Sequence, residues 1–238
     1  LLEKKSIRIK YGKNQMINRQ RYFEYWPLHL RLLVSTNLAI NSGTNASNLR
    51  LVELYINDAS NGVYIEYERI DENFLRRHKY MPVNIYKGEN YNTETMVDVD
   101  YNLFNNPGLW TKNATFNKRD LTDKSDLEMF LLKLQSAETN NNDLNDFFTF
   151  IDLDIWAKFC AYTIISQNYH QSSRHNMRLI IDPWSGLVHP IVVDPGGDVK
   201  VLDNLNKNLP LDYFTNDLTA FLNKNSIFLD KKYEWLNY

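Results

Sequence analysis

Two short apolar segments joined by strong turn chemistry constrain this chain more than any other feature. Residues 177–181 and 188–193 each favour a strand, and the sequence DPWSG at 182–186 between them is typical of a tight turn. We therefore expect an antiparallel β-hairpin. Because its two strands pair side by side, Asn176 before the first strand and Asp194 after the second would emerge within a few Å of each other.

An amide oxygen and a carboxylate that meet at one sheet edge suit a divalent cation bound to a polyphosphate. Mg²⁺ and Mn²⁺ take hard oxygen ligands, and the glycines after Asp194 let the backbone approach a ligand closely. Each residue also has a structural reading. Asp194 before Pro-Gly-Gly is typical of a turn, and Asn176 at a strand start is typical of a hydrogen-bonding cap.

The order of elements predicts a mixed fold. We expect strands at 6–11, 49–57, 63–69 and 83–87, with a turn at 58–62, and helices at 27–40, after Asp71, around 127–134, from Asp152 to about 166, and in the tail beyond 214. Pro27, Asp71 and Asp152 are the expected helix starts. This order favours an α+β fold with a strand-rich N-terminal lobe at about 1–90 and a helix-rich C-terminal lobe at about 124–238 that contains the β-hairpin. The Asn-, Thr- and Asp-rich stretch at about 91–123 is the predicted linker or insert.

Composition excludes several classes of protein. The 238 residues carry 27 basic and 29 acidic side chains, so the net charge of -2 argues against nucleic-acid binding. Cys160 is the only cysteine, which excludes an intrachain disulfide and a cysteine-based zinc site, and its apolar neighbours predict that it is buried. No apolar run reaches the length of a membrane span. The abrupt start without a methionine is what we expect of a piece of a longer polypeptide.

Ordered motifs along the chain resemble one known family. The polar loop 168–176, which contains Asn-Tyr-His and ends in His-Asn, is followed by MRLIIDPWSG at 177–186 and PIVVD at 190–194. Upstream lie an entry strand at 4–10, a strand-turn-strand at 52–71 that ends in Glu-Arg-Ile-Asp, and NIYK at 84–87. This ordered set resembles the CotH family of atypical protein kinases, from about Lys5 to Asp198.

The resemblance implies a protein-kinase-like fold that moves the γ-phosphoryl group of ATP, with Mg²⁺ or Mn²⁺, to Ser or Thr hydroxyls of a protein substrate. It implies Asp194 as the main metal ligand and Asn176 as a second one. Lys10 or Lys87 would neutralise phosphate oxygens, and Glu68 would orient whichever lysine does so. On sequence alone, both lysines are also typical of solvated strand residues, and Glu68 of a surface ion pair with Arg69 or Arg50.

The loop departs from the family pattern at one chemically important place. Family members carry an aspartate before His-Asn that accepts the proton of the attacking hydroxyl, whereas this chain has no Asp or Glu between Asp154 and Asp182. His170 stands at or beside that place, and a neutral imidazole can serve as the base near pH 7. The same change is also typical of a protein that binds ATP and transfers poorly. The family's second aspartate after Asp194 is absent unless Asp198 takes its place.

Three hypotheses about function follow. The first is a CotH-like kinase, active or weakened, that acts on a protein. The second is a pseudokinase that binds nucleotide or metal and acts as a scaffold in a surface or coat assembly. The third is a structural interaction domain with an empty cleft. Analogy with the family favours an extracellular or a cell- or spore-surface setting, and the sequence itself leaves the compartment open.

Overall fold

The computed structural model describes residues 4–12, 14–17, 20–90, 102–114, 120–140, 144–168, 170–195 and 214–237. Its strands are β1 (Ile7–Lys10), β2 (Tyr22–Pro27), β3 (Leu49–Ile56), β4 (Ala59–Tyr67), β5 (Asn84–Gly88), β6 (Trp110–Ala114), β7 (Met177–Ile181) and β8 (Val188–Pro190). Its α-helices are α1 (Leu30–Asn41), α2 (Glu72–Arg77), α3 (Ser125–Thr139), α4 (Leu144–Phe147), α5 (Leu153–Ser166), α6 (Asp217–Leu222) and α7 (Ser226–Asn237). The fold is mixed α+β, as the sequence predicts.

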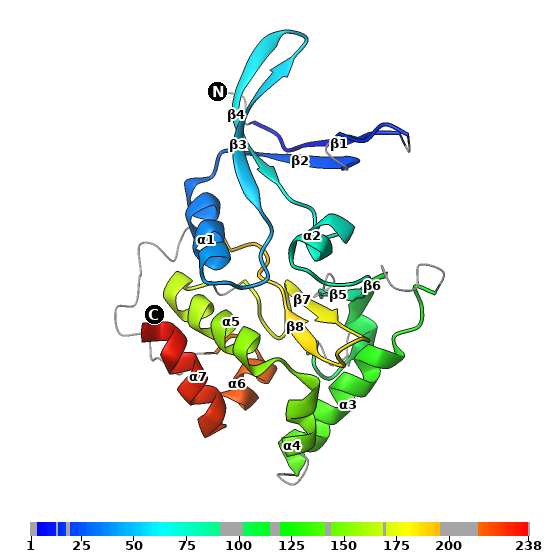
Figure 1. Cartoon of the computed structure of the whole chain (residues 1–238), viewed down its shortest axis with the longest axis vertical. Coiled ribbons are helices and arrows are strands. Elements are labelled where there is room, and N and C mark those ends of the chain that lie inside the picture. The colour runs from blue at the N-terminus through cyan, green and yellow to red at the C-terminus, as the bar shows by residue number, and fades with distance from the viewer. Residues whose placement is uncertain are drawn as a thin grey trace.

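The first sheet lies at one end of the molecule and is antiparallel throughout, in the order β1-β2-β4-β3 (Figure 1). Helix α1 packs against it through a small apolar cluster of Leu32, Leu49 and Ile65. The hairpin of β3 and β4 turns at Asn57 and Asp58, whose φ angles of 50° and 64° are the left-handed values that a tight hairpin turn requires. Its tip projects beyond the rest of the sheet (Figure 1).

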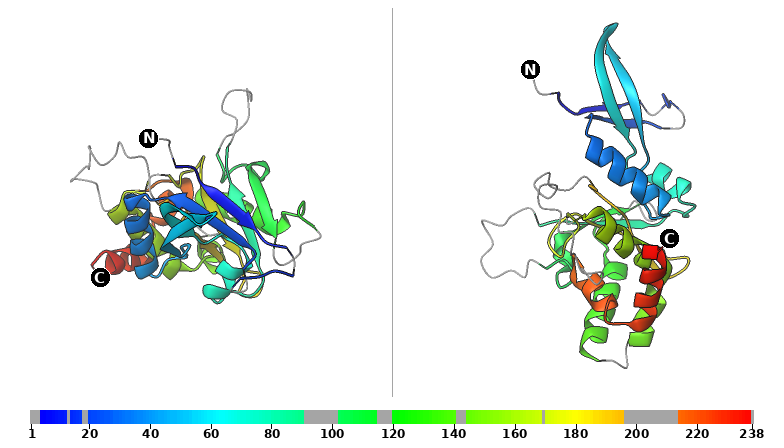
Figure 2. Two further views of the ribbon diagram at one scale, coloured as in Figure 1. Left: turned by 90° about the horizontal axis from the view of Figure 1, so that it is seen from above. Right: turned by 90° about the vertical axis from the view of Figure 1, so that its left-hand side faces the viewer.

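The second sheet, in the order β6-β5-β7-β8, separates the first sheet from most of the helices (Figures 1 and 2). Successive side chains on a strand face opposite sides, and apolar residues occupy both sides here. Tyr86 and Leu179 belong to the large helical core. Ile85 and Ile180, which are register partners, pack with residues of α2 on the opposite face. The sheet is therefore covered on both faces. The end of its strands near Asn176 is the part that is left for a site.

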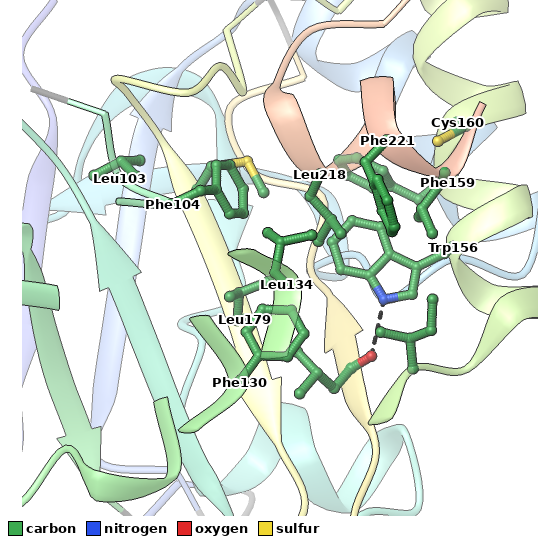
Figure 3. Packing of buried hydrophobic residues seen from close by; sticks show 14 of the residues in the cluster. Leu103, Phe104, Phe130, Leu134, Trp156, Phe159, Cys160, Leu179, Leu218 and Phe221 are labelled. Carbon is green, nitrogen blue, oxygen red and sulfur yellow. Dashed lines mark hydrogen bonds between the residues drawn. The ribbon is translucent and has the colours of Figure 1, made fainter. Parts of the chain in front are cut away.

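The large core holds the helices to the lower face of the second sheet. Figure 3 shows Phe130 and Leu134 of α3, Trp156 of α5 and Leu218 of α6 packed around Leu179, all 1% exposed or less. The Trp156 indole N–H donates to the carbonyl oxygen of Val188 at 2.9 Å, which ties α5 to β8 (Figure 3). Cys160 is buried at the edge of this core, as predicted.

Several predicted boundaries are confirmed and two are wrong. Asp71 and Asp152 cap α2 and α5, each accepting a hydrogen bond from a backbone N–H in the first turn. Pro27, however, ends β2 opposite Tyr64 instead of opening a helix, and His29 caps α1. The predicted turn at 58–62 is also wrong, because the left-handed pair at Asn57 and Asp58 reverses the chain earlier and lets β4 begin at Ala59.

The second half contains one strand that the sequence analysis missed and one that is shorter than predicted. Strand β6 lies inside the predicted linker at 91–123 and pairs with β5, so β5 belongs to the second sheet although it precedes residue 90. Strand β8 ends at Pro190, although the Ile191 N–H still donates to the carbonyl oxygen of Arg178 at 3.0 Å. The Val192 N–H then donates to the carbonyl oxygen of Asn45 at 2.8 Å. The hairpin, α3 and the helical tail are present as predicted. In the described part of the chain, no helix is long and apolar enough for a membrane crossing.

Neighbouring residues of α3 provide a direct test of the core. Phe130 is 1% exposed, whereas Met129 beside it is 50% exposed. Phe130→Ala should lower the free energy of unfolding by about 3–5 kcal/mol, because it leaves a cavity at the centre of the helical layer. Met129→Ala is the matched control and should change it by no more than about 0.5 kcal/mol. Urea denaturation followed by circular dichroism measures both, and equal effects would show that this helix face is not the core.

Candidate functional site

The site is built on the loop between α5 and β7. Helix α5 ends where Gln167 adopts a left-handed conformation, with φ at 51°, which turns the chain sharply into the loop. The Asn168 side chain then accepts a hydrogen bond from the backbone N–H of His170 at 3.2 Å. The imidazole of His170 reaches across to the segment that follows β8, where its Nδ1 lies 2.8 Å from Oδ2 of Asp194. Loop and hairpin therefore meet at one point.

A buried amide fixes the distance between the loop and both ends of the hairpin. Gln171 is 1% exposed. Its Nε2 donates to the carbonyl oxygens of Ile191 at 2.8 Å and of Asn176 at 3.3 Å, and its Oε1 accepts from the N–H of Val193 at 3.0 Å. The side chain thus bonds to the backbone just before β7 and just after β8. The sequence analysis did not identify Gln171, and no local pattern distinguishes it from a surface glutamine.

Asn176 and Asp194 both lie at the edge of the second sheet that faces the first. Continuing the register of β7 and β8 beyond Leu179 and Pro190 would set Asn176 opposite Val193, the residue before Asp194. Asn176 and Asp194 have φ angles of 58° and 44°, and Asn and Asp tolerate this left-handed region better than other residues with a side chain. The left-handed backbone agrees with the structural interpretation of Asp194 as a turn residue, and the roles of both residues as metal ligands stay predictions.

One cavity of about 710 Å³ lies between the two sheets and gathers most of the predicted site residues. Lys10 of β1 and Glu68 after β4 line it from the first sheet, and Lys87 of β5 lines it from the second. Asn176 and Asp194 complete this wall. His170 contacts Asp194 but does not line the cavity itself. The cavity therefore brings together two lysines, an amide and a carboxylate that are far apart in the sequence.

Glu68 has a different partner from the one expected. Its carboxylate accepts hydrogen bonds from the guanidinium of Arg77 in α2, at 3.0 Å from Nε to Oε2, and from the backbone N–H of Asn48 at 2.8 Å. Neither Arg69 nor Arg50 is its ion-pair partner, since Arg50 pairs with Glu66. Glu68 thus fastens α2 to the first sheet at the mouth of the cavity.

A further carboxylate in the cavity, that of Glu89, was missed by the sequence analysis. Glu89 follows β5 and its side chain is only 5% exposed. Its oxygens lie 3.7 Å from Lys87 Nζ, 3.7 Å from Arg178 Nη1 and 2.7 Å from His175 Nδ1. A usable signal was present, because Ile85, Lys87 and Glu89 alternate along one face of a strand. Predicting the strand to end at Lys87 hid that alternation.

Aromatic residues of the first sheet face the same space. The rings of Trp26 and Tyr67 stack with their centroids 5.3 Å apart, and both residues line the cavity. Burial raises the pKa of Tyr67 to about 12, and the negative charge of Asp194 acts in the same direction. Tyr67 is therefore a neutral phenol at physiological pH, close enough to Asp194 to sense its charge. The cavity combines a flat aromatic surface with charged groups.

The family sequence pattern described as CotH kinase protein matches residues 2–194. The chain belongs to the CotH kinase family. The matched span contains every predicted site residue from Lys10 to Asp194. No curated protein matches the chain.

The residue types at the CotH site fit Mg²⁺ or Mn²⁺ only as a partial shell. Within the described ranges, no group of three or more His, Cys, Asp or Glu side chains is placed to hold a metal ion. Asn176 and Asp194 offer one amide oxygen and one carboxylate. Mg²⁺ commonly takes one or two carboxylates from a protein and completes its shell with water and substrate phosphates. The donor set therefore suits a cation that arrives with a nucleotide.

Replacing Gln171 tests whether its buried amide organises the site. Gln171→Met keeps the volume but leaves two carbonyls and one N–H without this partner, so the free energy of unfolding should fall by roughly 2–4 kcal/mol. Gln15 is exposed, and Gln15→Met is the matched control that should change it by less than about 0.5 kcal/mol. Thermal denaturation measures both. A Gln171→Met protein as stable as the wild type would show that these three bonds do not hold the loop.

Proposed function

We propose that this CotH family member is an atypical protein kinase that transfers the γ-phosphoryl group of ATP to Ser or Thr hydroxyls of a protein substrate. The observation that carries the proposal is the single cavity that Lys10, Lys87, Asn176 and Asp194 line together. Phosphoryl transfer depends mainly on positioning and on neutralising charge, and this cavity offers both. The family match supports the same chemistry.

The proposal includes a kinase-like division of the chain into two lobes. The first sheet with α1 would form an N-terminal lobe, and the helices beneath the second sheet a C-terminal lobe, with ATP between them. The cavity is lined by residues of both sheets, which supports this arrangement. So does the chain order of α5, loop, hairpin and Asp194, which brings the loop and the hairpin end together.

Each group in the cavity then has a role. Trp26 and Tyr67 would provide a stacking surface for the adenine base. Lys10 and Lys87 would hold phosphate oxygens from the two sides of the cavity. Asn176 and Asp194 would hold Mg²⁺ or Mn²⁺, which when bound neutralises charge on the phosphates. The roles of Asn176 and Asp194 are those that the family resemblance implies. The resemblance implied Lys10 or Lys87 with Glu68 orienting it, whereas here both lysines are proposed and Glu68 pairs with Arg77. The aromatic surface is added from the structure.

The transfer step can be written with His170 as the proton acceptor. The hydroxyl oxygen of the substrate forms a bond to the γ-phosphorus while the bond from that phosphorus to the β,γ-bridging oxygen breaks, and ADP leaves. His170 takes the hydroxyl proton. The imidazole is suited to this because its Nδ1 is hydrogen-bonded to the Asp194 carboxylate. The other ring nitrogen, Nε2, then remains to take the proton. The alternative proposal, a pseudokinase scaffold that binds nucleotide without efficient transfer, is favoured by the absence of any acidic residue in this loop.

Asp194→Asn tests the cation and nucleotide site. The variant removes the carboxylate but keeps a residue that tolerates the left-handed backbone. ATP with Mg²⁺ or Mn²⁺ should raise the melting temperature of the wild type, because a ligand that binds only the folded state stabilises it. The variant should lose most of this increase, because it binds the ligand more weakly. Radiolabel transfer from ATP should be lost as well.

The matched control for this variant is Asp58→Asn, which replaces another left-handed aspartate in an exposed turn far from the cavity. It should bind ATP like the wild type. If Asp194→Asn keeps both binding and transfer, the assignment of this residue is wrong. If the wild type shows no shift with ATP and metal, the nucleotide site itself is absent.

His170→Ala separates the kinase from the scaffold. If His170 is the base, the rate of radiolabel transfer should fall by about 10²- to 10⁴-fold, while the thermal shift with ATP and metal persists. Transfer at the wild-type rate would remove His170 from the mechanism. A wild-type protein that binds ATP but transfers no label to itself or to an acidic generic substrate would support the pseudokinase.

A further inference from the structure

A carboxylate from the C-terminal tail holds the loop that carries the site. The Oδ1 atom of Asp217, the first residue of α6, accepts a hydrogen bond from the Ser173 hydroxyl at 2.9 Å. The backbone N–H of Asp217 donates to the same hydroxyl oxygen at 2.9 Å. Its other carboxylate oxygen, Oδ2, accepts a hydrogen bond from the side-chain amide of Asn102. Asp217 therefore joins α6, the loop and the segment before β6 at one point.

The part of the loop that Asp217 holds is a tight turn at residues 172–175. The first and last residues of this turn donate to each other's carbonyl oxygens, at 3.0 and 3.3 Å. The two carbonyl oxygens between them accept from the N–H groups of Leu103 at 2.8 Å and of Asn90 at 3.1 Å. The turn leads directly into Asn176, so the contacts that hold the turn also constrain the proposed cation ligand.

Helix α6 is a firm support for this carboxylate because it is anchored in the large core. Leu218, the next residue, is fully buried, and Phe221 is 7% exposed (Figure 3). Asn216 caps the helix, and its side-chain amide also lies 3.8 Å from the sulfur of Met177 at the start of β7. The family sequence pattern covers residues 2–194, so this support comes from a part of the chain outside the pattern.

We propose that Asp217 is a positioning residue of the site: it holds the turn at residues 172–175 and, through the turn, sets Asn176 for the cation and its nucleotide. The inference rests on the proposed function for the identity of the ligand, whereas the hold on the turn does not depend on it. Packed contacts of this kind can couple to a neighbouring site and change its affinity. A merely structural Asp217 would lower stability and leave both the turn and the affinity unchanged.

The test exchanges the partners of one hydrogen bond. In Asp217→Asn the new side chain can still accept from the Ser173 hydroxyl, but its amide nitrogen then meets the amide nitrogen of Asn102, donor against donor. Asn102→Asp alone would place two carboxylates side by side. The double variant, Asn102→Asp with Asp217→Asn, again pairs one donor with one acceptor. It should recover most of the wild-type behaviour, because the two residues act as a coupled pair.

Amide hydrogen exchange of the whole chain measures the hold on the turn, because it reports local opening. In Asp217→Asn the N–H groups of Asn90, Leu103, Ser172 and His175 should exchange about 2- to 30-fold faster, the range expected for the loss of a coupling contact. The hairpin of β3 and β4 should keep its wild-type rates and is the internal reference.

Isothermal titration with ATP and Mg²⁺, well below the melting temperature of each variant, measures the effect on the site. Asp217→Asn should bind about 2- to 30-fold more weakly than the wild type. Melting temperature alone does not test the proposal. Burial and the negative charge of Asp217 raise the pKa of Glu138 in α3, so Asp217→Asn also relieves a repulsion.

Asp154→Asn is the matched control. Asp154 is also an aspartate in the first turn of a helix, and it binds the tail through the indole N–H of Trp235 at 2.9 Å. It lies at the opposite end of α5 from the loop. Asp154→Asn should keep wild-type exchange at the turn and wild-type affinity for ATP. Ser173→Ala removes the same contact from the other side and takes the place of Asp217→Asn if that variant does not fold.

The inference fails if Asp217→Asn, or Ser173→Ala in its place, exchanges at the turn like the wild type. It also fails if Asp154→Asn has the same effect, or if the double variant recovers nothing. Faster exchange with unchanged ATP affinity would overturn the positioning role. A wild type that binds no ATP would sink the proposed function, while the exchange rates would still decide whether Asp217 holds the turn.

Discussion

The hydrogen bonds of Gln171 are the interaction on which the site depends. Strand β8 is only three residues long, and backbone pairing with β7 does not extend as far as Asp194. Beyond it, the Gln171 amide replaces the missing ladder by bonding to the backbone of Asn176, Ile191 and Val193. A buried side chain that makes all its bonds permits few alternative geometries. The two residues proposed to hold the cation are therefore fixed relative to each other by a third.

The two sheets are joined by a segment that also approaches the site. Asn45 and Ala46, after α1, bind the chain beyond β8 through the Val192 N–H and a parallel bridge. The Ala46 carbonyl accepts a hydrogen bond from Arg77, whose guanidinium also binds Glu68. One chain of contacts thus connects the first sheet, α2 and the residues leading to Asp194. Any motion that opens the cavity must break these bonds or carry them along. The hydrogen bonds of Glu68 connect it to this chain of contacts through Arg77.

The sequence predicted the parts of the structure whose signal is local. The turn at 182–186 and the caps Asp71 and Asp152 depend on residues within one turn of the chain, and all three are present. Strand β6 depends on a partner outside its own segment, namely β5. Gln171 was missed for the same reason, because its importance lies in burial and in bonds to distant backbone, which amino-acid type alone does not reveal. Glu89 was missed because the predicted strand ended before it, although the alternation along β5 was visible in the sequence.

The loop without an acidic residue has a consistent electrostatic consequence. Its two histidines each have a ring nitrogen near a carboxylate from another element, His170 near Asp194 and His175 near Glu89. Only the contact of His170 with Asp194 is a hydrogen bond. An ionised carboxylate only accepts hydrogen bonds, so a neutral His170 imidazole must carry its proton on Nδ1. That leaves Nε2 as an acceptor, the form that a general base requires. A loop aspartate would instead add negative charge beside Asp194 and repel it. Under the proposed function, a histidine at this place would reduce repulsion near the phosphates while keeping a group that can accept a proton.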